Sequence, residues 1–142
     1  MVKIPIELNF FAGGLRPMLN VILSFEDPKI FLPVKAIIDT GSPTTLIGVS
    51  DMLRMRLSSL QLRKLEGSQR EVNIGGGKVY TVKVDDFRLR VGNFLDTKMS
   101  VQFPISGEVK SQPSLLGVDF LEKIKANFCF NPSAKESYLE IP

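Results

Sequence analysis

The chain has 142 residues, of which 44% are hydrophobic and 23% are charged, and its 18 Lys and Arg against 15 Asp and Glu give a net charge of +3. This length suits one folded domain and is short for two, so we expect a single domain over residues 1–142. No apolar stretch is long enough to cross a bilayer, and Glu7 and Asn9 interrupt the start where a secretory signal needs an unbroken apolar core. We therefore expect a soluble, cytoplasmic chain with no membrane partner.

The absence of histidine and the single cysteine limit the kinds of catalytic and metal site that the chain can form. The sequence has no histidine, which excludes Ser-His-Asp and Cys-His catalysis and zinc sites built on histidine. In a hydrolase of this composition, carboxylates, lysine or tyrosine must move the protons, and we expect neither a metal nor a cofactor. Cys129 is the single cysteine, so we interpret it as a small buried hydrophobe. The basic residues are scattered and not interleaved with aromatic residues, which favours a solvated basic face over a nucleic-acid surface.

Alternation of apolar and polar residues dominates the first part of the chain. From Ile4 to Phe10 every second residue is apolar, which indicates one β-strand with one buried face. Gly13-Gly14 and the segment 26–29 are typical of turns. Strands are therefore expected over residues 3–10, 18–25, 30–38 and, briefly, 45–47.

A short helix follows. Ser50 is expected to cap it, because several apolar residues downstream and Val49 share one helical face. Those residues are Val49, Met52, Leu53 and Leu57. Residues 58–68 are polar and indicate no single structure.

The second half of the chain again predicts strands. Residues 70–84 alternate on both sides of Gly75-Gly76-Gly77, which predicts a hairpin with a pliant tip. A turn at Gly92-Asn93 separates two more strands, and residues 104–113 are expected as a loop. The remaining elements are strands over 87–91, 95–103, 114–117, 127–130 and 137–141, and a helix over 118–124 with Val118, Leu121 and Ile124 facing inward. About ten strands and two short helices predict a mainly β domain, a closed or sandwich-like barrel.

One acid stands at the end of an apolar run. Asp39 follows Ala36-Ile37-Ile38 and opens the turn Asp39-Thr40-Gly41-Ser42. Carboxylates are rarely buried without a partner, because removing a charge from water costs several kcal/mol or shifts its pKa. One interpretation is an ordinary Asx-type turn. A second, the phosphate-binding turn of sugar kinases and actin-like ATPases, needs two domains and a much longer chain.

A third interpretation is catalytic. The apolar strand would place the Asp39 carboxylate in a low-dielectric floor, and Gly41 would let a backbone or a substrate come close. The hydroxyls of Thr40 and Ser42 stand at a spacing that can hold a carboxylate in place. The four residues alone do not decide among these interpretations.

Three motifs taken together favour the catalytic interpretation. The segments "IIDTGSPTTLI", "NIGGG" and "SLLGVDFL" occur in this order. They resemble the pattern of the retropepsin family of aspartic proteases, which comprises the retroviral proteases and their single-lobe cellular relatives. That pattern is an apolar strand into Asp-Thr/Ser-Gly-Ala/Ser, a glycine-rich flap hairpin, and an apolar-apolar-Gly strand before a short helix. The resemblance covers roughly residues 30–130 and implies a closed acid-protease β-barrel.

The resemblance also implies roles for single residues. Asp39 would be the catalytic acid, Thr40 would bond to its counterpart across a dimer axis, Gly41 would contact the substrate backbone, and Ser42 would bond to the outer carboxylate oxygen. The flap would comprise Ile74, Gly75, Gly76, Gly77 and Lys78. The strand beneath the acidic loop would comprise Leu115, Leu116 and Gly117.

Plainer interpretations stand beside these roles. The glycine triplet is also compatible with a simple turn, and Leu115 and Leu116 are core residues in either case. Asp119 is interpreted as a helix cap rather than a catalytic group. Pro43 follows Ser42 where the family commonly has a small residue, and the chain is longer than the viral enzymes in residues 11–29 and after Asn131. The terminal segments 2–8 and 137–141 are candidates to tie two chains together.

Aspartic proteases activate water between two carboxylates, one accepting a proton while the other donates one. The sequence contains one Asp-Thr-Gly, at Asp39. We therefore predict a homodimer in which both copies of Asp39 meet at a twofold axis, an inactive monomer, and a bell-shaped, acidic pH profile. The expected activity is an aspartic endopeptidase acting on protein or peptide substrates. A non-catalytic module that dimerises or binds peptides is the alternative, and a nucleic-acid-associated factor is a third, motivated by the basic balance alone.

Overall fold

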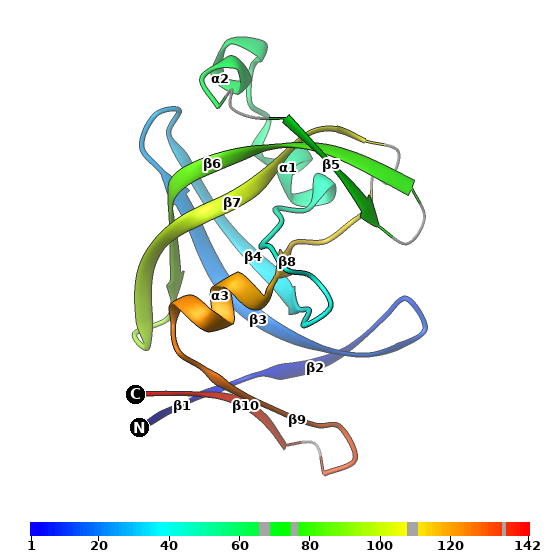
Figure 1. Cartoon of the computed structure of the whole chain (residues 1–142), viewed down its shortest axis with the longest axis vertical. Helices are drawn as coiled ribbons and strands as arrows, with labels where there is room; N and C mark the ends of the chain where they lie inside the picture. The colour runs from blue at the N-terminus through cyan, green and yellow to red at the C-terminus, as the bar shows by residue number, and fades with distance from the viewer. Residues whose placement is uncertain (66–68, 75–76, 108–110, 135) are drawn as a thin grey trace.

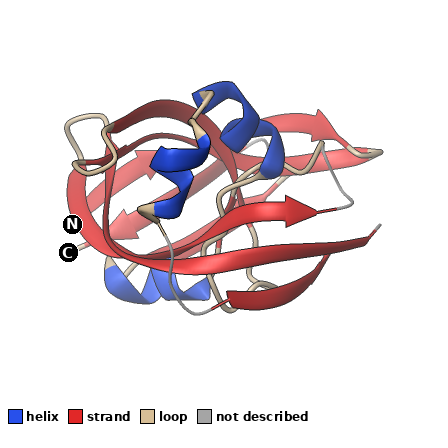
Figure 2. Ribbon diagram, turned by 90° about the horizontal axis from the view of Figure 1, so that it is seen from above, coloured by secondary structure: helices blue, strands red, loops and turns tan. Residues whose placement is uncertain are grey.

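Strands make up most of the molecule. The structure, a computed structural model, describes residues 1–65, 69–74, 77–107, 111–134 and 136–142. Long curved strands dominate both views, and the helices are short (Figures 1 and 2). In chain order the described elements are β1 (Val2–Pro5), β2 (Glu7–Phe11), β3 (Gly14–Phe25), β4 (Ile30–Ile38), α1 (Val49–Met55), α2 (Ser59–Arg63), β5 (Gln69–Ile74), β6 (Gly77–Val91), β7 (Leu95–Gly107), β8 (Leu115–Leu116), α3 (Val118–Lys123), β9 (Asn127–Asn131) and β10 (Glu136–Ile141). The prediction of a mainly β fold with a few short helices is confirmed.

The larger sheet has seven strands. Its main order is β5-β6-β3-β4-β8, with β2 paired to β3 and β7 paired to β6. β3 and β4 run antiparallel, whereas β8 runs parallel to β4 and places Leu115 opposite Ile37 and Leu116 opposite Ile38. Because β4 and β8 end side by side, the residues that follow each strand meet at one edge of the sheet.

The β6–β7 pair is longer than the sequence predicts. Residues 87–91 are not a separate strand, because β6 continues through a register shift between Val84 and Phe87, where Asp86 has a φ of 58°. Such a bulge bends a strand without ending it. β7 runs on to Gly107, so the loop predicted over 104–113 begins too early. Pro104 pairs with Thr81 beside a second register shift, and irregular positions of this kind are where strands accommodate proline.

The strand predicted over residues 3–10 is two strands in different sheets. β1 pairs with β10, β2 pairs with β3, and the N–H of Ile6 between them donates to the carbonyl of Ser137 at 3.1 Å. Ile4 and Ile6 are buried as expected, but Phe10 is 81% exposed. Alternation therefore identified the faces of this segment but not its partners. β3 also begins earlier than predicted, at Gly14.

The smaller sheet has the order β1-β10-β9. Ile4 and Leu139 pair across it and are both buried in the core. The two terminal segments thus pair with each other within one chain, and β10 has a neighbour on each side. Cys129 in β9 is half-buried rather than fully buried.

Each predicted helix departs from its expected buried face at one residue, Leu53 in α1 and Val118 in α3. The N-cap of α1 is Gly48, and Ser50 lies inside the helix with its Oγ donating to the carbonyl of Gln112 at 3.0 Å, so the predicted Ser50 cap is wrong. Leu53, expected to face inward, is 55% exposed, whereas Asp51 is buried. α2 occupies part of the ambiguous segment.

In α3 the predicted inward residues Leu121 and Ile124 are half-buried against the core and Phe120 is fully buried, whereas Val118, also predicted to face inward, is 41% exposed. The N-cap of α3 is Gly117, and Asp119 is already inside the first turn. Among the largest fully buried side chains of the core are Phe87 of β6, Phe103 of β7 and Phe120 of α3.

Candidate active site

Asp39 stands immediately after β4. Its N–H donates to the carbonyl of Leu116 in β8 at 2.9 Å, which ties the start of the turn to the neighbouring strand. The N–H of Gly41 donates to Asp39 Oδ1 at 2.9 Å, and the N–H of Ser42 donates to the Asp39 carbonyl at 3.1 Å. Ile38 is buried, while Asp39 itself is half-buried. The turn therefore presents a carboxylate at the surface end of a core strand, in an orientation that Gly41 helps to fix.

The first turn of α3 holds the loop that follows Asp39. The N–H of Val118 donates to the carbonyl of Ser42 at 2.8 Å, and the N–H of Asp119 donates to the carbonyl of Pro43 at 3.3 Å. These N–H groups open a helix and have no partner within it. The loop carbonyls satisfy them, so α3 and the loop stabilise each other.

Asp119 adds a second attachment from its side chain. Its Oδ1 accepts a hydrogen bond from Thr45 Oγ1 at 2.8 Å, and its Oδ2 accepts one from the Thr45 N–H at 3.0 Å. The Thr45 hydroxyl in turn accepts from the Gly117 N–H at 3.2 Å. Thr45 is buried, so each of these bonds satisfies a polar group that water does not reach. The sequence-based interpretation of Asp119 as a helix cap missed this role.

Gly117 allows the close approach of loop and strand. A Cβ at this position would lie 2.5 Å from the Thr44 carbonyl oxygen and 2.7 Å from that of Ser42. Any side chain would push the loop away. Next to it, Leu115 exchanges backbone hydrogen bonds with Leu46 at 2.8 and 2.9 Å. The segment Leu115, Leu116 and Gly117 thus packs directly against the residues that surround the acidic turn.

Ser42 and Thr40 lie in the same turn as Asp39. Ser42 Oγ donates to the carbonyl of Thr44 at 2.7 Å, so in the single chain this hydroxyl braces the loop backbone instead of the Asp39 carboxylate. Thr40 is exposed at the tip of the turn.

The β5–β6 hairpin corresponds to the glycine-rich motif. Ile74 pairs with Gly77, and Asn73 pairs with Lys78, which is exposed. Gly75 and Gly76 lie outside the described residues. In Figure 1 the end of this hairpin and the loop after β4 lie on the same side of the molecule.

Asp51 in α1 is a further buried acid. Its Oδ2 accepts from Ser114 Oγ at 2.7 Å, and its Oδ1 pairs with Arg54 Nη2 at 2.6 Å. Ser114 Oγ also accepts from the Gly48 N–H at 2.9 Å. These bonds hold α1 to the start of β8 and give Asp51 a structural role.

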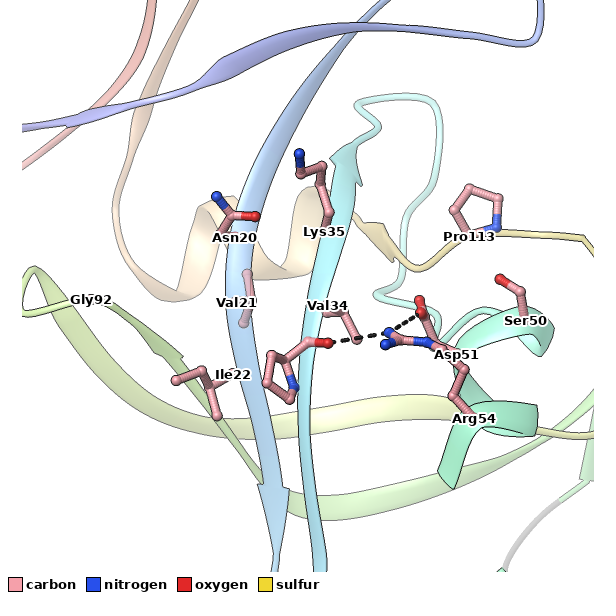
Figure 3. Close-up of a pocket in the computed structure, with 11 residues that line it drawn as sticks. Asn20, Val21, Ile22, Val34, Lys35, Ser50, Asp51, Arg54, Gly92 and Pro113 are labelled. Atoms are coloured by element: carbon pink, nitrogen blue, oxygen red, sulfur yellow. Dashed lines mark hydrogen bonds and ion pairs between the residues drawn. The ribbon is translucent and has the colours of Figure 1, made fainter. Parts of the chain in front are cut away.

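A groove of about 560 Å³ lies beside this network (Figure 3). Ser50, Asp51 and Arg54 from α1 face the outer sides of β3 and β4 across it. Arg54 donates to the Pro33 carbonyl at 3.1 Å and to Asp51, so the polar groups pair with each other rather than converge on the groove. Asp39 does not line it.

Two observations concern other kinds of site. Among the described residues, no group of three or more Cys, Asp and Glu side chains is arranged to hold a metal ion. None of the described helices is long and apolar enough to span a membrane.

Comparison with known proteins identifies the family. Residues 24–120 match the family model described as aspartyl protease. The chain belongs to the retropepsin-like aspartyl protease family. The matched region contains the acidic turn, the β5–β6 hairpin, β8 and the start of α3, and it leaves β1, β2, β9 and β10 outside. No curated protein sequence matches the chain.

Solved structures show the same fold. A retropepsin-like aspartic protease from Rickettsia conorii is 18% identical, with a TM-score of 0.57, over 97% of this chain and 89% of that one. The protease of EIAV in complex with the inhibitor HBY-793 is 16% identical, with a TM-score of 0.52, over 86% of this chain and all of the other. The retropepsin-like fold of this member of the aspartyl protease family is therefore established well beyond its three short motifs.

Proposed function

We propose that this protein is an aspartic endopeptidase that acts as a homodimer, with one Asp39 from each chain. The observation that carries the proposal is the position of Asp39, which lies at the end of a buried strand in the single Asp-Thr-Gly of the sequence. Hydrogen bonds to β8, from α3 and from the N–H of Gly41 hold its turn in place. Membership of the aspartyl protease family supports it.

The chemistry requires two such acids. One carboxylate accepts a proton from the attacking water, while the other, protonated, donates to the oxygen of the scissile carbonyl. Like charges about 3 Å apart do not both ionise, so the pair shares one proton and titrates in two steps. A twofold axis beside Asp39 would supply the second acid from an identical chain. We expect activity to be bell-shaped in pH and greatest in acid, and the monomer to be inactive.

The neighbouring residues of the acidic turn and of the hairpin take roles around this pair. Thr40 would bond to its counterpart across the axis, Gly41 would contact the substrate backbone, and Ser42 would brace the loop. The hairpin end from Ile74 to Lys78 would close over an extended protein or peptide substrate, adding backbone hydrogen bonds as a strand does. The proposal takes residues 1–142 as one cytoplasmic protease domain that needs no metal, cofactor, membrane or nucleic acid.

The test compares cleavage by matched variants. The wild-type chain, Asp39→Asn and Asp27→Asn are incubated with an unfolded protein across a range of pH, with and without a statine-type inhibitor. Asp27 is the matched control, since its carboxylate is largely exposed and pairs with Lys64 at 3.0 Å. Cleavage by the wild type and Asp27→Asn that is lost in Asp39→Asn and with the inhibitor supports the proposal. A verified dimer that cleaves nothing at any pH overturns it in favour of a non-catalytic binding module.

A further inference from the structure

The β2–β3 hairpin extends beyond the acidic turn. The last pair between β3 and β4 is Met18 opposite Ile37, so continuing the register places Arg16 level with Asp39. Toward its N-terminal end β3 extends past that level to Gly14, and the turn at Gly13 joins it to the preceding strand, β2. With a rise of about 3.3 Å per residue, the turn stands roughly 10 Å beyond the level of Asp39. In Figure 1 this turn projects from the same side of the molecule as the loop after β4.

One face of this hairpin is apolar and uncovered. Phe10 and Leu15 are cross-strand partners, and they lie on the face of β3 that carries the buried Leu19 and Val21 nearer the middle of the strand. Phe10 is nevertheless 81% exposed and Leu15 37% exposed. The core face of β3 thus continues past the core itself and ends in two large apolar side chains in contact with solvent.

The other face is fixed to the body by polar contacts. Glu7 forms an ion pair with Lys35 of β4 at 2.8 Å and accepts a hydrogen bond from Asn20 Nδ2 at 3.1 Å. Nearer the turn, Arg16 Nε donates to the Phe11 carbonyl at 3.3 Å. These contacts set the direction in which the hairpin leaves the molecule.

We propose that residues 7–18, the β2–β3 arm, dock onto a second copy of this chain, with Phe10 and Leu15 buried against it. This inference rests on the proposed function. If two copies of Asp39 meet, the end of β4 faces the partner, and whatever extends farther in that direction reaches the partner's surface. By twofold symmetry each chain receives the arm of the other, so both pairs of apolar side chains are covered.

Two further observations favour a second copy as the occupant. The arm lies before residue 24 and so outside the region that the aspartyl protease family model matches. In the smaller sheet the C-terminal strand β10 is paired with β1 on one side and β9 on the other, so this strand has no free backbone edge for a second chain and only the outer edges of β1 and β9 remain. Because β10 itself cannot pair with a second chain, the apolar contact of the arm would take its place in the dimer.

The test measures association and cleavage separately. Dimer dissociation constants are determined by analytical ultracentrifugation for the wild type, for Phe10→Ser/Leu15→Ser, and for the control Phe31→Ser. Phe31 is 64% exposed near the opposite end of β4, next to Ile30. We expect the double variant to dissociate at least about tenfold more readily, because it loses two buried apolar side chains per arm, and the control to match the wild type. A photo-crosslinking residue at position 10 should yield covalent dimers.

The outcomes separate the arm from the proposed function. Equal dissociation constants for wild type and double variant, or a dimer that position 10 fails to crosslink, overturn the arm while wild-type cleavage leaves the protease proposal standing. An arm-dependent dimer that cleaves no substrate overturns the protease proposal and leaves the arm standing. A double variant that recovers wild-type cleavage at high protein concentration supports both, since it retains the dyad and lacks only affinity.

Discussion

Thr45 gives both its backbone N–H and its hydroxyl to the carboxylate of Asp119, at 3.0 and 2.8 Å. Thr45 follows the acidic turn, and Asp119 lies in the first turn of α3, 74 positions later in the chain. The pair therefore joins the loop that carries Asp39 to the segment that follows β8. Its consequence is that the acidic turn is held by a side chain that takes no part in the proposed chemistry.

Removing this carboxylate should cost stability. In Asp119→Ala the N–H and the hydroxyl of the buried Thr45 lose their acceptors, and leaving a buried polar group unpaired costs about 1–3 kcal/mol. We expect a loss of about 2–4 kcal/mol in the free energy of unfolding, measured by urea denaturation, and a lower rate of cleavage. Asp119→Asn keeps one acceptor oxygen, so its free energy of unfolding should lie between those of the wild type and Asp119→Ala. An Asp119→Ala protein as stable as the wild type would show that the pair does not hold the loop.

Gly117 makes the same junction possible through its lack of a side chain. In Gly117→Ala the new Cβ would meet the Thr44 carbonyl oxygen at 2.5 Å, and that oxygen belongs to backbone that cannot rotate aside. Forcing an extra methyl group into a packed site costs typically about 1–3 kcal/mol. We expect a lower melting temperature together with reduced cleavage, because relieving the contact shifts the loop that begins at Asp39.

The control for this change is Gly14→Ala. A Cβ at Gly14 would have no neighbour within 4 Å, and its backbone is not in the left-handed region. Its melting temperature should stay close to that of the wild type. If Gly117→Ala and Gly14→Ala have the same melting temperature, the close approach at Gly117 does not constrain the loop.

Much of the site is local in sequence, and that part was predictable. The apolar run into Asp39 is contiguous, so its strand and turn follow from neighbouring residues alone. The alternation around the three glycines predicted the β5–β6 hairpin, and Leu115-Leu116 predicted a short strand. Each of these signals spans fewer than about twenty residues and depends only on the period of the apolar positions.

The attachments around the turn are not local, and the sequence could not assign them. Asp119 and Thr45 pair across the whole middle of the chain, as do Asp51 and Ser114. An acid near a helix start looks like a cap in either case, and nothing in its neighbours indicates a distant threonine. The same limit applies to Val118, whose N–H bonds to the distant Ser42 carbonyl while its side chain is 41% exposed.

Alternation also failed to distinguish a covered face from an uncovered one. Ile4, Ile6 and Phe10 follow one period-two pattern, yet the first two are buried and Phe10 is exposed. The pattern gives the direction of a side chain relative to the strand, whereas burial depends on which element lies opposite. For Phe10 we propose that this element belongs to a second chain.

The polar base of the arm predicts a pH dependence of stability. The hydrogen-bonded ion pair with Lys35, together with hydrogen bonds from Asn9 and Asn20, holds the pKa of Glu7 below its ordinary value. Because the folded protein favours the charged carboxylate, this stabilisation is complete above the pKa of Glu7 in the unfolded chain and is lost as pH falls through the lower pKa of the folded state. Both side chains are about half exposed, at 47% and 48%, so the pair contributes less than about 1 kcal/mol.

Glu7→Gln should therefore be less stable than the wild type at neutral pH, and the difference should shrink to nothing in strong acid, where the wild-type carboxyl is also protonated. The measurement is the free energy of unfolding of both proteins across this range, at low and at high salt. Raising the salt concentration at neutral pH should reduce the difference, because ions screen an exposed pair. A difference that stays constant with pH would assign the effect of Glu7 to its packing instead of its charge. The same variant should weaken dimer formation where Glu7 is charged in the wild type, because the arm of residues 7–18 then loses the contact that fixes its base.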